Sequence, residues 1–291
     1  MIAVKSVYFL GGIMEIGYYN GEFKALSDVR IPLTDRSVFF GDGVYDAAIG
    51  RCGRIYLGDE HLERFVKNAE RMDIELGYTK NELKRLTEEA VERSGEKCFF
   101  LYYHASRKSD TRRHFYQKGD GSNLLITVKS CALPDPNTKM KLVTYEDKRY
   151  RYCSIKTLNL LPSVLASGFA TALGADEAVF HRGNEVTECA HSNVSIIKDG
   201  KLYTHPADEY ILAGVAREKL LEKCTRLKIP FSQRAFTLDA LYTADEVLVT
   251  SSSKICVRAS SVNKVTYHNA EGSCGDILCK ALCADFINAT E

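Results

Sequence analysis

The sequence has no apolar run long enough to cross a membrane and no block of like charge. Lysine and arginine total 39 against 38 aspartate and glutamate residues, which leaves a formal net charge of +1. Nucleic acid and an anionic membrane surface are therefore weakly supported as partners. The apolar N-terminal segment, residues 7–14, is too short to span a bilayer and lacks a small-residue cleavage site. We predict a strand there, not a signal segment.

The ten cysteines include no C-x-x-C pair and no compact spacing framework. This pattern is typical of reduced thiols used as small apolar residues, and it favours the cytoplasm as the compartment. Two pairs could suggest a metal: Cys279 with Cys283, and Cys189 with His191. Neither pair is accompanied by a second pair of ligands at the spacing typical of metal sites, so the sequence predicts no metal site.

A hydrophobic content of 45% and a length of 291 residues are typical of an ordinary globular protein with two domains. We predict an N-terminal α+β domain over residues 1–130, a linker over 131–139 that contains two prolines, and a C-terminal domain over 140–291. No internal repeat or low-complexity segment interrupts either half.

The elements expected from hydrophobic periodicity alternate between strands and amphipathic helices. In the first half we expect strands at 17–23, 43–50, 98–106 and 123–129, and helices at 58–76 and 79–94. In the second half we expect a strand at 140–147, strand pairs with turns at 177–188, 193–205 and 246–257, and helices near 162–174, 214–227 and 274–288.

Lys156 stands between two apolar segments. The alternation in residues 153–156 predicts the end of a half-buried strand, and Pro162 then opens a helix. A lysine in this setting is either a surface residue whose stem lies along apolar groups or a Schiff-base lysine. The second role requires the amine to lose its proton near neutral pH, which apolar surroundings promote.

A Schiff-base lysine that carries pyridoxal phosphate needs three further groups: a carboxylate for the pyridine nitrogen, an anion site for the phosphate, and a group for the substrate carboxylate. Glu188 is a candidate for the first, although a strand-end glutamate is ordinarily solvated. Gly214 begins a predicted helix, so the amides of Val215 and Ala216 can face an anion. Further phosphate candidates are the hydroxyls of Ser251 and Ser252 and the guanidinium of Arg64.

These motifs together resemble the class IV, or fold type IV, pyridoxal-phosphate aminotransferases, and among them the D-amino-acid transaminases. The resemblance covers nearly the whole chain, with its segments in the family's order: DRSVFFGDGVYD at 35–46, HLERF at 61–65, SIKTLNLLPSVLA at 154–166, EAVFHRGNEVTE at 177–188, SNVSIIKDGKLYTHP at 192–206, ILAGVARE at 211–218 and VTSSS at 249–253. It implies an N-terminal α+β domain and a barrel-like C-terminal domain flanked by helices. It also implies a homodimer, because loops of a second subunit complete the family's active sites.

The resemblance also implies a role for each matching residue. Lys156 is the lysine that holds the cofactor and then moves a proton, and Tyr45 lies beside it. Glu188 pairs with the ring nitrogen, Leu212 packs against the ring, and Arg64 binds the phosphate. The implied reaction is a ping-pong transfer of an amino group between an amino acid and a 2-oxo acid.

Arg112 and His114 bear on the choice of substrate. Their spacing resembles the arginine-x-histidine pair that helps bind the substrate α-carboxylate in D-amino-acid transaminases, which favours a D-amino acid such as D-alanine. Three alternatives stay open: an L-branched-chain aminotransferase, an aminodeoxychorismate lyase and a non-catalytic cofactor-binding protein. The chain departs from the family pattern at 189–191, where it has Cys, Ala and His, at Ala216, and at Ala47 and Ile49.

Overall fold

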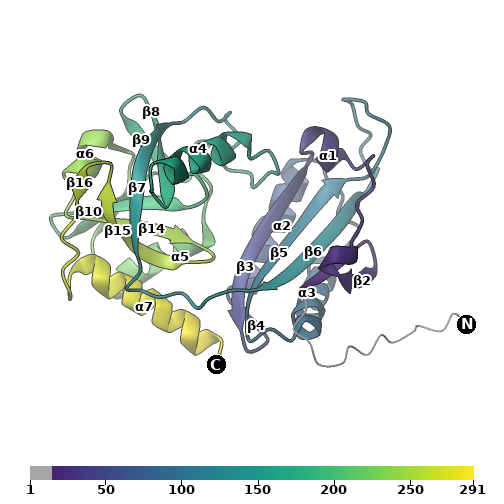
Figure 1. Ribbon diagram of the computed structural model, residues 1–291, viewed down its shortest axis with the longest axis horizontal. Coiled ribbons are helices and arrows are strands. Elements are labelled where there is room, and N and C mark those ends of the chain that lie inside the picture. Colours follow the sequence, from purple (N-terminus) through teal and green to yellow (C-terminus); the bar gives the residue numbers. More distant parts are fainter. Residues whose placement is uncertain (1–14) are drawn as a thin grey trace, which may run out of the picture.

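The computed structural model describes residues 15–291 and contains two β-sheets that lie side by side (Figure 1). The strand predicted in residues 7–14 lies outside the described residues. Residues 131–138, which contain no helix or strand, connect the last strand of the first sheet to the first strand of the second.

The N-terminal sheet has six strands in the order β2-β1-β6-β5-β3-β4, and every neighbouring pair is antiparallel. Its strands are β1 (Ile16–Tyr19), β2 (Glu22–Ala25), β3 (Gly43–Arg51), β4 (Arg54–Ile55), β5 (Cys98–Arg107) and β6 (Ser122–Ser130). The segment predicted as a strand at 17–23 forms two paired strands, β1 and β2, and the three long predicted strands are confirmed.

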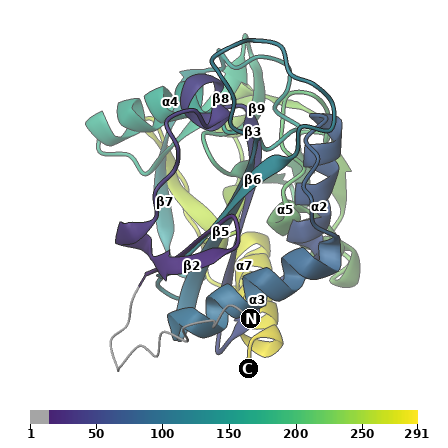
Figure 2. The ribbon, with the colours of Figure 1, turned by 90° about the vertical axis from the view of Figure 1, so that its right-hand side faces the viewer.

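Helices α2 (Gly58–Arg71) and α3 (Lys80–Ser94) cover one face of this sheet, as Figure 2 shows. Their apolar faces pack on the alternate residues of β3 and β5 that point towards them, including Phe65 against Tyr103. The prediction that α2 extends to residue 76 is wrong. Asp73 takes a left-handed backbone conformation with φ of 51°, which ends the helix.

The C-terminal sheet has ten strands and curls on itself, in the main order β12-β11-β10-β14-β15-β7-β8-β9-β13 with β16 paired to β15. Its strands are β7 (Lys139–Glu146), β8 (Glu177–Arg182), β9 (Glu185–Cys189), β10 (Asn193–Lys198), β11 (Lys201–Thr204), β12 (Phe231–Gln233), β13 (Phe236–Thr237), β14 (Glu246–Ser251), β15 (Ile255–Val262) and β16 (Val265–Thr266). The helices predicted here are confirmed as α4 (Leu161–Ala172), α5 (Val215–Arg226) and α7 (Cys274–Ala289).

Short elements were not predicted: η1 (Leu26–Asp28), α1 (Arg36–Phe40), α6 (Leu238–Tyr242) and strands β4, β12, β13 and β16. With two to five residues each, they show too little periodicity to be recognised.

The strand predicted at 153–156 is wrong. Residues 152–156 contain turns and no strand, and only Thr157 forms an isolated bridge, to Val44.

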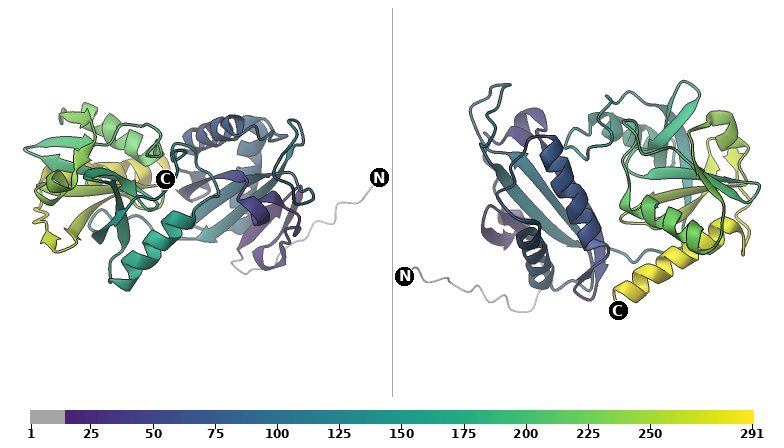
Figure 3. Two further views of the ribbon diagram at one scale, coloured as in Figure 1. Left: turned by 90° about the horizontal axis from the view of Figure 1, so that it is seen from above. Right: turned by 180° about the vertical axis from the view of Figure 1, so that it is seen from behind.

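The two halves meet along the face of the N-terminal sheet that α2 and α3 leave uncovered. Ile49 and Tyr56 belong to the same buried cluster as residues of α5 and α7, and the Tyr56 ring meets Phe286 edge to face at 5.3 Å. Figure 3 shows α7, in yellow, running beneath this junction. Since Tyr45 and Ile49 lie on the same face of β3, this contact orients Tyr45 towards the C-terminal half.

Candidate active site

A cavity that is open to solvent lies where the two halves meet, and its empty space, with the open mouth included, is about 840 Å³. Its walls combine segments that are far apart in the sequence. Of the predicted site residues, those that line it are Tyr45, Arg64, Lys156, Glu188, Leu212, Gly214, Val215, Ala216, Ser251 and Ser252.

Lys156 reaches the cavity because its backbone is fixed to the first residues of β3. The Tyr45 amide donates to the Lys156 carbonyl at 2.9 Å, and the Leu158 amide donates to the Gly43 carbonyl at 3.0 Å. The Lys156 Nζ lies 4.3 Å from the centre of the Tyr45 ring. A turn followed by this short antiparallel contact therefore orients the amine, in place of the predicted strand.

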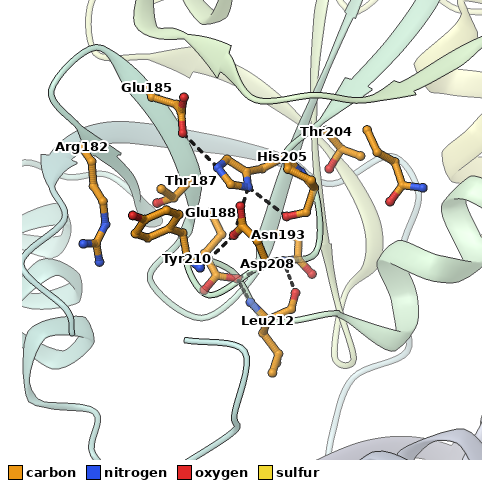
Figure 4. Close-up of polar contacts among 12 residues, drawn as sticks. Arg182, Glu185, Thr187, Glu188, Asn193, Thr204, His205, Asp208, Tyr210 and Leu212 are labelled. Atoms are coloured by element: carbon orange, nitrogen blue, oxygen red, sulfur yellow. Dashed lines mark hydrogen bonds and ion pairs between the residues drawn. The ribbon is translucent and has the colours of Figure 1, made fainter. Parts of the chain in front are cut away.

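Glu188, at the end of β9, is a buried carboxylate with three protein donors. The Leu212 amide and the Asn193 Nδ2 each donate at 3.0 Å, and Figure 4 shows both beside the carboxylate. The Arg149 Nη1 donates to the other oxygen at 2.5 Å. Burial raises the pKa of Glu188 above its ordinary value, although the Arg149 charge and the hydrogen bonds from Arg149 and the Leu212 amide oppose the shift.

Gly214 precedes the first turn of α5, which begins at Val215. A Cβ at Gly214 would collide with Asn193 Oδ1, so this position has no room for a side chain. The helix N-terminus thus faces the cavity with the free amides of its first turn. Arg64 reaches the same end of the cavity, since its Nη1 donates to the Ala213 carbonyl at 3.0 Å.

Hydroxyl groups at the end of β14 complete this part of the wall. Thr250, Ser251 and Ser252 line the cavity, and Thr250 Oγ1 is buried without a hydrogen-bond partner among residues 15–291. A guanidinium, a helix N-terminus and an unpaired hydroxyl at one end make an anion site. An amine and a buried carboxylate lie elsewhere on the same walls, so the donor set fits pyridoxal phosphate.

Arg112 and His114 are not among the residues that line the cavity. The Arg112 guanidinium lies 5.5 Å from the centre of the Phe40 ring, and the His114 ring lies 5.3 Å from it. Arg36 holds this loop to α1 by donating to the backbone carbonyls of residues 113 and 114, at 2.7 and 3.3 Å. Within one chain, Arg112 and His114 therefore stay outside the lining of the cavity that contains Lys156.

Sequence reasoning missed several residues of the cavity. Arg149 forms ion pairs with Asp147 and Glu188, and Asn193 joins Glu188 to the Leu212 backbone. No spacing pattern marks Arg149, whereas Asn193 could have been suspected from its position in SNVSIIKDG. Of the positions that depart from the family pattern, residues 189–191 and Ala216 line the cavity, whereas Ala47 and Ile49 do not.

A comparison with protein-family models identifies the relationship. The model of amino-transferase class IV matches residues 43–262. The chain belongs to the amino-transferase class IV family. A curated relative named D-alanine aminotransferase, from Staphylococcus haemolyticus, is 37% identical over 239 residues, which cover 81% of this chain and 85% of the relative.

Solved structures of the class IV family share the fold. A branched-chain aminotransferase from Thermoproteus uzoniensis superposes with a TM-score of 0.86, at 19% identity, over 95% of this chain and 96% of that one. The branched-chain aminotransferase from Escherichia coli also gives a TM-score of 0.86, at 17% identity, over 96% of each chain. The predicted fold type IV architecture is confirmed, and this class IV aminotransferase is an enzyme.

In residues 15–291 no helix is both long and apolar enough to cross a membrane. The same part of the chain has no group of three or more His, Cys, Asp or Glu side chains arranged to hold a metal ion.

Proposed function

We propose that this class IV aminotransferase binds pyridoxal phosphate at Lys156 and transfers the amino group of a D-amino acid, such as D-alanine, to a 2-oxo acid. The observation that carries the proposal is the convergence of an amine, a buried carboxylate and an anion site on one cavity. The curated relatives named D-alanine aminotransferase support the choice of substrate.

Bound pyridoxal phosphate supplies a carbonyl for the substrate amine and a ring that accepts the electrons left when the Cα proton departs. In the proposed mechanism, Lys156 Nζ takes that proton from the substrate Cα and returns it on the cofactor side. Glu188 holds a proton at the ring nitrogen, and its three donors keep the carboxylate oriented. Arg64, the start of α5, Ser251 and Ser252 bind the phosphate, while Leu212 packs on the ring.

The proposal includes a homodimer in which Arg112 and His114 enter the cavity of the partner and bind the substrate α-carboxylate. Within its own chain this loop lies against Phe40, away from the cavity lining. Large apolar side chains are exposed along α4, next to the cavity, as a second copy would require: Leu161, Val164, Leu165, Phe169 and Leu173. A guanidinium and a carboxylate form a strong, oriented pair.

Two further parts of the proposal concern organisation and compartment. We propose that residues 1–130 and 140–291 act as two domains joined by 131–139, on the support of the two separate sheets. We also propose a cytoplasmic location, on the support of ten cysteines that are all free thiols.

A single-turnover panel tests the proposed reaction. Stoichiometric holoenzyme is mixed with matched D- and L-amino acids, and both the 2-oxo acid released and the absorbance of the bound cofactor are measured. We expect D-alanine to yield one equivalent of pyruvate, with conversion of the cofactor to its amine form, and L-leucine to react far more slowly. Faster reaction of L-leucine would contradict the D-amino-acid assignment, and pyruvate release from aminodeoxychorismate would indicate a lyase.

A further inference from the structure

Asp46 is a fully buried carboxylate that takes no part in the mechanism described above. It follows Tyr45 on β3, and successive residues of a strand point to opposite faces of the sheet. Tyr45 lines the cavity, while Asp46 contacts α2 on the other face through His61 and Arg64.

Both carboxylate oxygens of Asp46 accept hydrogen bonds from Arg64. The Arg64 Nε donates to Oδ2 and the Nη2 donates to Oδ1, each at 2.8 Å, which is a two-pronged ion pair. Oδ1 also lies 2.8 Å from His61 Nδ1, and because a carboxylate only accepts, the buried imidazole donates. Burial raises the pKa of Asp46, but the charges and hydrogen bonds of Arg64 and His61 outweigh this effect and hold that pKa well below its ordinary value.

This arrangement determines which N–H groups of Arg64 remain for a ligand. A guanidinium has five N–H groups, of which two bond to Asp46 and one to the Ala213 carbonyl. The two that remain, one on Nη1 and one on Nη2, belong to a side chain that lines the cavity next to the start of α5. Resting on the proposed cofactor, we propose that Asp46, supported by His61, is a positioning residue that sets Arg64 to bind the phosphate of pyridoxal phosphate.

Asp46 has two opposing effects on the binding of a phosphate by Arg64. A held guanidinium loses little conformational freedom when the phosphate binds, so the ion pair with Asp46 favours binding. The negative charge of Asp46 itself repels a phosphate dianion and disfavours binding. We expect the positioning of Arg64 to outweigh the repulsion by the Asp46 charge. Whether phosphate binding weakens or strengthens when Asp46 is replaced tests this expectation.

The experiment compares two ligands that differ only in the phosphate. Dissociation constants of the apo-protein for pyridoxal phosphate and for pyridoxal are measured by absorbance titration, and their ratio reports the phosphate contribution. In Asp46→Asn the amide offers a single acceptor and places its NH₂ against Arg64 or His61. We expect the preference for pyridoxal phosphate to fall about tenfold or more, since hydrogen bonds between charged groups are the strong ones.

Asp276→Asn is the control, because Asp276 is also a buried carboxylate that accepts from an arginine, Arg258, at 2.6 Å, and it lies away from the cavity lining. We expect the ratio of its dissociation constants for pyridoxal phosphate and pyridoxal to equal that of the wild type.

A second variant, His61→Leu, removes one donor to Asp46 and leaves the Asp46–Arg64 ion pair in place. We expect the preference to fall by a smaller factor, about two- to fivefold. If thermal melting shows that Asp46→Asn is unfolded, His61→Leu decides.

An unchanged or increased preference for pyridoxal phosphate in folded Asp46→Asn would overturn the inference, since it would mean that Asp46 acts only as a charge or as packing. That outcome leaves the proposed function intact. Wild-type protein that does not distinguish pyridoxal phosphate from pyridoxal would contradict the proposed function, and the inference with it.

Discussion

The region proposed to bind the cofactor and the loop proposed to bind the substrate carboxylate differ in how they are held in the molecule. The residues proposed to bind the cofactor line one cavity of one chain, and Glu188, Arg64 and Gly214 are each fixed by internal contacts. The loop with Arg112 and His114 contacts α1 of its own chain and lies apart from that cavity. The difference suggests that one chain can bind the cofactor, whereas recognition of the substrate carboxylate depends on a second copy.

Lys156→Ala should have the largest effect, because it removes the amine proposed to bind the cofactor and to move the proton. We expect no measurable transamination, loss of the cofactor's covalent absorbance band, and an unchanged melting temperature of the apo-protein. Lys141→Ala, at an exposed position on β7, is the control and should be fully active. Full activity of Lys156→Ala would refute the proposed mechanism.

Glu188→Gln should come next, since a neutral amide cannot hold the ring nitrogen in its protonated form. We expect kcat to fall about 10²- to 10⁴-fold, with a much smaller loss of cofactor affinity. Glu246→Gln is the matched control: Glu246 is also buried, but it accepts from the Gly275 amide and lies outside the cavity lining. Equal effects of the two variants on kcat would mean that Glu188 has only a structural role.

Arg112→Ala should lower kcat/KM for D-alanine about 10- to 150-fold, through loss of a charge-assisted contact to the substrate carboxylate. Cofactor content and absorbance should stay normal, because Arg64 and α5 belong to the other end of the cavity. Arg113→Ala is the control, as Arg113 pairs with Asp110 and stacks on Phe115. Small and equal effects would make the loop a basic surface and leave the handedness of the substrate open.

Val164→Asp should weaken dimerisation about tenfold or more, because Val164 is 61% exposed in one chain and would place a charge in an apolar contact. Light scattering should then show a shift towards the 32.6 kDa monomer at concentrations where the wild type is a dimer. Leu227→Asp alters another exposed apolar residue, at the end of α5, and should leave the mass unchanged. A monomeric wild-type enzyme with full activity would contradict the homodimer.

Sequence patterns predicted the long elements, because burial of one face imposes a period on strands and helices. They failed for residues 153–156, where the apparent alternation reflects a turn that pairs only at Thr157. Local patterns and motif resemblance predicted Lys156, Glu188 and Gly214 as site residues, and all three line the cavity. They did not identify Arg149, nor the contact of Asp46 with Arg64, because these depend on how β3, α2 and the segment after β7 meet in space.

The most direct test of the shared site is to mix two inactive or impaired variants. Refolding Lys156→Ala together with Arg112→Ala should produce mixed dimers in which one site has Lys156 from one chain and Arg112 from the other. We expect recovery of about a quarter of the wild-type activity with D-alanine, since half of the dimers are mixed and each has one intact site. If a single chain supplied both residues, the mixture would show no more activity than the two variants measured separately.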